Sequence, residues 1–179
     1  MDNQVTMENY TKYYTDEGRA ACNSNATDKL KQTTNMSSTG SNEMIKNLNE
    51  IVVPALRQLN FKGSFPHFRR LTADRINLLT FQFDRHGGGF VIEIANCKPN
   101  GFMTSWGKEI KPNKLTSHDL DIRKRIQTNM TTDSSSTDGW FRYNKKHFTG
   151  PENIYKKVCK DVLSKLDIAD DYWKNGEIN

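Results

Sequence analysis

The run from Phe61 to Ile94, FKGSFPHFRRLTADRINLLTFQFDRHGGGFVIEI, constrains the fold of this chain more than any other segment. Apolar and polar side chains alternate along much of it, and polar turns interrupt the alternation at residues 72–75 and 84–89. This pattern is typical of strands that pack one face on a core and fold back through tight turns. The run therefore predicts an antiparallel meander with strands over residues 64–71, over residues 76–83 and from residue 90 onward.

The apolar residues of the second and third strands predict which face packs on the core. That face is formed by Leu79, Phe81 and Phe83 together with Phe90, Ile92 and Ile94, so Val91, Glu93 and Ala95 face away. Pro66 in the first strand has no backbone N–H, which favours an edge position or a bulge.

Apolar residues at spacings of three and four predict two helices that flank the strands. The first begins near Ser41 and continues to Leu59, with a kink or a new start at Pro54, which lacks a backbone donor. The last begins at Gly150-Pro151, with the proline in the first turn. Together these patterns predict an α+β domain, a mainly antiparallel sheet of four to five strands with two helices packed on one face.

The domain is expected over residues 41–170. Residues 1–40 contain few large aliphatic side chains and many Asn, Thr and Ser residues, so they bury too little apolar surface to offset the entropy of ordering. We expect a disordered polar N-terminal tail there; the alternative is a short helix over residues 9–14 that docks through its tyrosines. Residues 171–179 are expected to be a frayed C-terminus, although Trp173 offers a docking side chain.

Charge is uneven along the chain. Residues 41–150 hold 17 basic and 10 acidic side chains, whereas residues 1–40 and residues 151–179 each carry a net charge of −1. A positive field favours anionic partners and accelerates association with them. The alternative interpretation is a solvated basic face without a ligand.

No motif predicts a cofactor, a metal or a catalytic centre. The cysteines at 22, 97 and 159 lack the spacing of a zinc site or a disulfide framework, and the histidines lack metal-ligand spacing. A strand, rather than a Lys-Ser/Thr helix start, follows Gly87-Gly88-Gly89, so these glycines predict a hairpin turn and not a phosphate cradle. Without a signal peptide or a membrane-length apolar run, the expected setting is the cytoplasm, away from membranes.

Basic and aromatic residues supply the candidate binding site. Arginine and tryptophan dominate protein-binding hot spots, and aromatic rings beside arginines also suit single-stranded nucleic acid. In the segment Trp140-Phe141, alternation predicts that Phe141 is buried and Trp140 is partly exposed. The candidate partner-binding residues are Arg70, Arg85, His86, Trp106, Arg123, Arg125, Trp140 and Arg142.

Five segments carry a resemblance to a known family: LRQLNFKGSFPHFRR, INLLTFQFDR, GFVIEIANC, RKRI and DGWFRYN. In this order they resemble the bacterial domain family of unknown function DUF4304, over about residues 43–166. The chain departs from that family by a Ser/Thr-rich insert before DGWF and by its first 40 residues. Small domains of this kind resemble antitoxin or immunity proteins of bacterial competition systems, which implies a toxin-like protein partner.

Three functional hypotheses follow from the sequence. The leading one is a non-enzymatic interaction protein of immunity type that binds and neutralises a partner toxin. The second is a nucleic-acid-binding accessory domain that uses a basic aromatic face. The third is an enzyme built around Asp84 and His86, which would need a further catalytic group from elsewhere in the fold.

Overall fold

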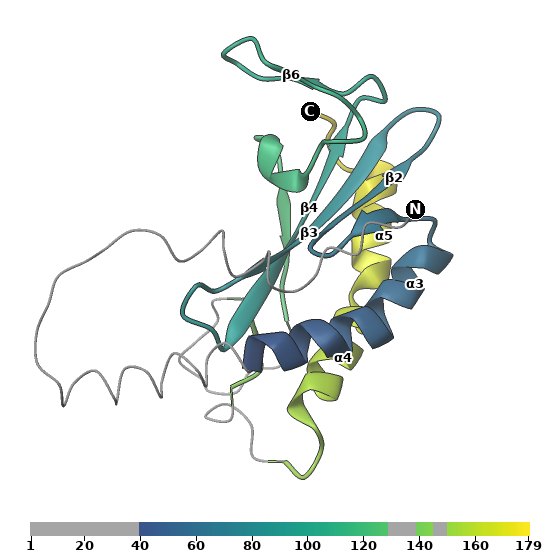
Figure 1. The fold of residues 1–179 in the computed structure, drawn as a ribbon. Coiled ribbons are helices and arrows are strands. Elements are labelled where there is room, and N and C mark those ends of the chain that lie inside the picture. The colour runs from purple at the N-terminus through teal and green to yellow at the C-terminus, as the bar shows by residue number, and fades with distance from the viewer. Residues whose placement is uncertain (1–39, 129–138, 145–149) are drawn as a thin grey trace, which may run out of the picture.

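The computed structural model describes residues 40–128, 139–144 and 150–179. The predicted N-terminal tail therefore lies outside the described residues, apart from residue 40, which is helical. The predicted α+β class is confirmed: a mainly antiparallel sheet carries two helical segments on one face (Figure 1).

The sheet has six strands, in the order β1-β2-β3-β4-β7. The sixth strand, β8, pairs with the start of β4 along the same edge that β7 occupies further on. All pairings are antiparallel, as the polar turns predict. The long central pair, β3 and β4, holds the sheet together over eight paired positions. The strands are β1 (Lys62–Ser64), β2 (His67–Leu71), β3 (Ile76–Phe83), β4 (Gly89–Cys97), β7 (Lys124–Ile126) and β8 (Phe141–Arg142).

The predicted single strand over residues 64–71 is wrong, because the chain turns back inside it. Phe65 and Pro66, joined by a cis peptide bond, separate β1 from β2, and Ser64 pairs with His67. Proline cannot donate to a strand ladder, so the pairing breaks at this position. This hairpin raises the number of strands to six.

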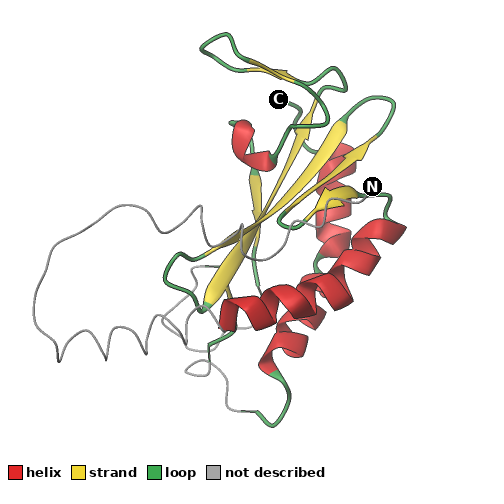
Figure 2. Cartoon of the chain, in the orientation of Figure 1, coloured by secondary structure: helices red, strands yellow, loops and turns green. Residues whose placement is uncertain are grey.

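Side-chain alternation places one face of the central strands in the main core, as predicted. Phe81 and Phe90 lie there, and Phe141 of β8 stacks on Phe90 with ring centroids 5.2 Å apart. Phe141 is fully buried and Trp140 is partly exposed, which confirms the prediction for that pair. Figure 2 shows the long helices together on this side of the strands.

The first helical segment covers residues 40–58 and contains a π-helical turn. This turn, η1 (Leu48–Val52), precedes α3 (Val53–Gln58), and Val53 N–H donates to the Leu48 carbonyl five residues back. Pro54 has no N–H and its ring crowds the preceding turn. The helix widens before the proline instead of ending, so that Leu48, Val52 and Leu56 all stay in the core.

The last helical segment begins later than predicted. Pro151 lies outside it, and α4 (Ile154–Ser164) begins after Asn153. The Asn153 side chain accepts hydrogen bonds from the N–H groups of Tyr155 and Lys156. An asparagine cap satisfies exposed donors of the first turn, which the proline cannot do.

The C-terminal residues are ordered against the sheet rather than frayed. Helix α5 (Leu166–Asn175) follows α4, and the Trp173 ring is buried with Nε1 donating to the Leu78 carbonyl at 3.1 Å. Asn179 donates to carbonyls of Asn96 and Ile122. The amphipathic helical pattern therefore continues beyond the point where the sequence predicts its end.

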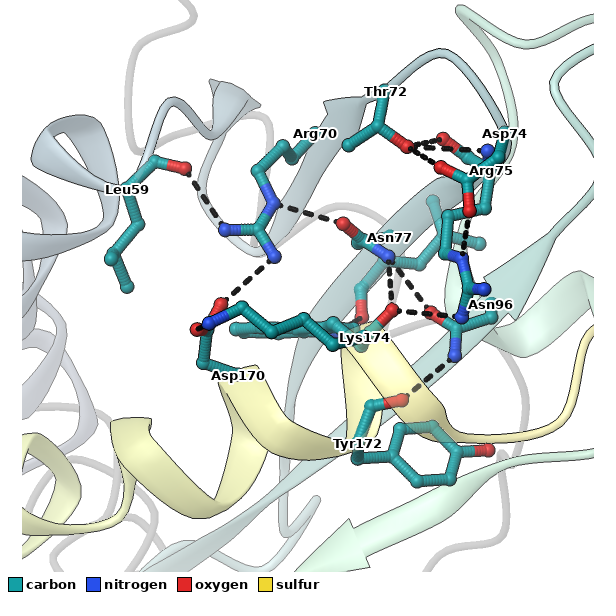
Figure 3. A network of polar contacts seen from close by, with 12 residues as sticks. Leu59, Arg70, Thr72, Asp74, Arg75, Asn77, Asn96, Asp170, Tyr172 and Lys174 are labelled. Atoms are coloured by element: carbon teal, nitrogen blue, oxygen red, sulfur yellow. Dashed lines mark hydrogen bonds and ion pairs between the residues drawn. The ribbon is translucent and has the colours of Figure 1, made fainter.

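Two buried asparagines join the end of α5 to the two central strands, β3 and β4 (Figure 3). Asn77 of β3 donates to the side-chain oxygen of Asn96 at 2.9 Å and to the Trp173 carbonyl at 3.1 Å. Asn96 of β4 donates to the Tyr172 carbonyl at 2.9 Å. The last turn of a helix leaves carbonyls without helical partners, and the Asn77 amide donates to one of these, the Trp173 carbonyl. The Tyr172 carbonyl accepts the Gly176 N–H in addition to the Asn96 amide.

Arg70 extends this network toward the helices. Its Nε donates to the side-chain oxygen of Asn77 at 2.9 Å, and its guanidinium pairs with Asp170 at 3.0 Å (Figure 3). Lys174 pairs with the same carboxylate. Burial raises the pKa of Asp170, but hydrogen bonds from Lys174 and Arg70 outweigh it and hold this pKa below its ordinary value.

A second, smaller core lies on the opposite side of the sheet. The chain between β4 and β7 forms a hairpin of β5 (Phe102–Met103) and β6 (Glu109–Ile110) and a short 3-10 helix, η2 (Ser117–Asp119). The buried residues of this second core are Ile76, Leu78, Ala95, Cys97, Leu115 and Leu120.

Replacing Asn77 by leucine should destabilise the fold. The change keeps the volume but removes the acceptor for Arg70 and the donor to Asn96 and Trp173, which leaves buried polar groups unsatisfied. We expect a loss of about 3 kcal/mol in the free energy of unfolding, measured by urea denaturation. Asn113→Ala, an exposed control, should change it by less than about 0.5 kcal/mol. Equal urea midpoints for the two variants would contradict the assigned role.

Candidate functional site

A row of polar side chains crosses the sheet on its distal face, the face opposite the long helices. One residue comes from each of four adjacent strands: His67 pairs with Thr80, Thr80 with Glu93, and Glu93 with Arg125. Because cross-strand partners point to the same face, these four side chains lie side by side. The register of the strands thus builds a polar site across the distal face of the sheet.

Glu93 is the centre of this row. Its side chain is 10% exposed, and its two carboxylate oxygens accept hydrogen bonds from Arg125 at 3.2 Å and Arg123 at 3.3 Å. His118 Nε2 lies 4.0 Å from the carboxylate. A buried carboxylate is costly unless charged donors surround it, and the two guanidinium groups meet that requirement.

His67, on β2, lies at one end of the row, and its imidazole is held neutral. Its Nδ1 shares a hydrogen bond with Thr80 Oγ1 at 3.1 Å, and its ring meets the His118 ring edge-on at 5.9 Å. Burial, followed by the nearby His118 and Arg69, lowers the pKa of His67, and Asp119 opposes this only in part. The imidazole therefore carries no charge at neutral pH.

The short helix η2 places His118 over the sheet. Thr116 and Asp119 form a reciprocal capping box, in which the Asp119 carboxylate accepts from the Thr116 N–H and hydroxyl, both at 2.8 Å. Leu115 and Leu120 anchor the two ends of this turn in the second core. A capped turn with two buried anchors fixes the imidazole between His67 and Glu93.

The predicted site residues divide between the two faces of the molecule. Arg123 and Arg125 lie in the Glu93 cluster. Arg142 lies on the distal face opposite Gly89, at the start of β4, over the Trp140 ring at 5.2 Å and 3.7 Å from the Asp84 carboxylate. Arg70 lies on the helix side, within the Asp170 network, and is thus separated from the others.

The remaining predicted residues occupy two separate loops. Arg85 and His86 are exposed in the hairpin between β3 and β4, where Arg85 Nε donates to His86 Nε2 at 3.0 Å. Trp106 is 78% exposed in the connection between β5 and β6. The structure therefore does not combine all eight residues into one patch.

The hairpin between β3 and β4 is a structural turn. Gly87 and Gly88 both have φ of 80°, which favours glycine, and the residues that follow enter β4, as the sequence predicts. The Asp84 carboxylate accepts the backbone N–H of His86 at 2.9 Å. Asp84 thereby stabilises the turn.

Sequence analysis missed Glu93, His67, Thr80 and His118 as site residues. A usable signal was present, because Glu93 is the one charged residue in the otherwise neutral strand GFVIEIANC. A charge on the face of a central strand requires a cationic partner from an adjacent strand. The alternating arginines of RKRI supply that partner, but the strand order that brings them to β4 follows from the fold and not from local sequence.

The described residues contain no group of three or more His, Cys, Asp or Glu that could hold a metal ion. Among these same residues, we find no helix with the length and apolar character that a bilayer crossing requires.

The architecture defines the chain as an α+β protein whose sheet has a helix-covered face and a distal face with a polar row. The chain belongs to the DUF4304 family, described as a domain of unknown function, whose model matches residues 52–167. Comparison with curated proteins and with solved structures gives no match.

The pKa of His67 offers a direct test of the site. Because it is lower in the folded chain than in the unfolded chain, the unfolded state takes up the proton first as the pH falls below about 6.5. This contribution to stability is complete above that pH and is lost as the pH falls toward the folded-state pKa. NMR titration of the imidazole signals should show Arg69→Gln raising the pKa of His67, while Lys156→Gln on α4 leaves it unchanged. A downward shift in the Arg69 variant would contradict the arrangement.

Proposed function

We propose that this protein is a non-enzymatic interaction protein of immunity type, which binds a toxin-like partner protein through the distal face and neutralises it. The observation that supports this proposal is the gathering of three predicted binding arginines on that face: Arg123, Arg125 and Arg142. The long helices pack on the helix side of the sheet, whereas on the distal face the smaller second core packs on the part around Ile76, Leu78 and Ala95. The proposed partner presents an acidic surface, since positive charge on one side is complementary to it.

The pattern of charge favours a protein partner over a nucleic acid. Glu93 lies between two of the arginines, and Asp84 lies beside Arg142. Carboxylates among the arginines repel a continuous line of phosphates, whereas a protein surface can offer isolated acidic side chains. The stacked pair of Arg142 on Trp140 is a feature that also suits a nucleic-acid base.

The proposed setting is a bacterial cytoplasm. Cys97 and Cys159 are free, buried thiols, and burial raises the pKa of Cys159 to about 12. Unreactive thiols of this kind suit a reducing compartment, where structural disulfides are rare.

Partner capture with matched variants tests the proposal. Immobilised full-length chain is incubated with native lysate of the source organism, next to a Trp140→Ala/Arg142→Ala variant and a Lys156→Ala/Lys160→Ala control. The control changes exposed lysines of α4, on the helix side. We expect the wild type and the control to capture the same protein in stoichiometric amount, and the distal-face variant to capture at least about tenfold less.

Neutralisation needs a second readout on the captured protein. Expressed alone, that protein should inhibit growth, and co-expression of the wild-type chain should restore growth where the distal-face variant does not. Two results would refute the proposal: capture that is unaffected by the distal-face variant, or recovery of nucleic acid alone that is released as salt rises.

A further inference from the structure

The arginine pair around Glu93 has an unusual arrangement of exposure. The Glu93 side chain is 10% exposed, whereas the side chains of Arg123 and Arg125 are 39% and 43% exposed. The negative charge is thus inside and the two positive charges are outside. Removal from water weakens solvent screening around the carboxylate, so the carboxylate holds both arginines firmly.

The contacts leave much of each guanidinium available for another acceptor. Glu93 accepts one hydrogen bond from Arg123 Nη1 on one oxygen and one from Arg125 Nη2 on the other. A guanidinium carries five N–H donors in a planar fork. Arg125 lies in β7 and Arg123 immediately precedes this strand, and both guanidinium groups reach Glu93 on the distal face.

We propose that Glu93 is a positioning residue that holds Arg123 and Arg125 as a clamp for a carboxylate of the partner protein. This inference rests on the proposed function and names the contact through which the partner is recognised. An incoming carboxylate takes the outer donors of the two guanidinium groups while Glu93 holds the inner ones. Planar donors that are already oriented bind a carboxylate with little further loss of side-chain entropy.

The local charge matches a single carboxylate. Apart from the His118 imidazole, which lies 4.0 Å from Glu93, the charged groups that pair with Glu93 or act on the neutral His67 are three guanidinium groups and two carboxylates: Arg69, Arg123 and Arg125 against Glu93 and Asp119. One positive charge remains, and one bound carboxylate neutralises it. A polyphosphate would bring more negative charge than the cluster compensates.

The alternative is that the pair serves only to neutralise Glu93. The two interpretations differ in sign for Glu93→Gln. If the surface attracts anions by net charge alone, loss of the carboxylate should strengthen anion binding. If Glu93 positions the clamp, the same change weakens binding although the net charge becomes more positive.

The experiment uses full-length chain and a fluorescent peptide of consecutive glutamates as the probe, followed by anisotropy at low salt. We expect Glu93→Gln to weaken binding about tenfold relative to wild type. Arg123→Lys and Arg125→Lys, which keep the charge but remove the fork, should each weaken it to a similar extent. Lys156→Gln on α4 should leave it unchanged.

Circular dichroism and thermal melting show whether each variant folds. If Glu93→Gln fails to fold, the two lysine variants decide, since Glu93 and the net charge are intact in them. Three outcomes would overturn the clamp. They are wild-type affinity in both lysine variants, tighter binding by folded Glu93→Gln, and no binding of the glutamate peptide by wild type. Displacement of the peptide by inorganic phosphate at lower concentration than by acetate would overturn the assignment to a carboxylate.

The outcome is separable from that of the proposed function. Partner capture that depends on Trp140 and Arg142 but persists in the lysine variants keeps the distal face as the binding surface and rejects the clamp. If these variants lose binding of the glutamate peptide and the wild type captures no partner, the clamp is kept and the immunity role is rejected.

Discussion

The amide pair of Asn77 and Asn96 is the constraint on which the arrangement of layers depends. These side chains lie opposite each other on β3 and β4, and both donate hydrogen bonds to carbonyls in the last turn of α5. Apolar contacts alone would let a helix slide on a sheet, since the hydrophobic effect is not directional. Amide hydrogen bonds to named carbonyls fix one position, because any other leaves buried polar groups unsatisfied.

The same strand register builds both faces. Asn77 and Asn96 face the helices, whereas Thr80 and Glu93, three residues further along β3 and three residues earlier on β4, face the distal side. A one-residue slip would turn every side chain of a strand to the other face. The helix anchor and the polar row therefore depend on one pairing, and a change that loosens the anchor also endangers the row.

Local patterns predicted the parts of the fold that local physics determines. Alternation along residues 76–94 was sufficient for the central hairpin and its core face, and helical spacing was sufficient for both helical segments. The chain turns back at Phe65-Pro66, where the strand pattern continues through the proline, and the last helix begins after its Asn153 cap and not at the earlier Pro151. Arg70 was assigned to a surface site because its partner, Asp170, lies 100 residues away, where no local pattern connects them.

The distal site could be predicted only in part for the same reason. RKRI identified Arg123 and Arg125, but Glu93 belongs to a different strand and lies 30 and 32 residues earlier in the chain. Position 93 has no structural need for a charge, since Val91 fills the same face of the same strand with an apolar side chain. Replacing a buried ion cluster by well-packed apolar residues is often neutral or stabilising. Stability alone therefore does not account for a carboxylate there, whereas holding two half-exposed guanidinium groups in fixed orientation requires one.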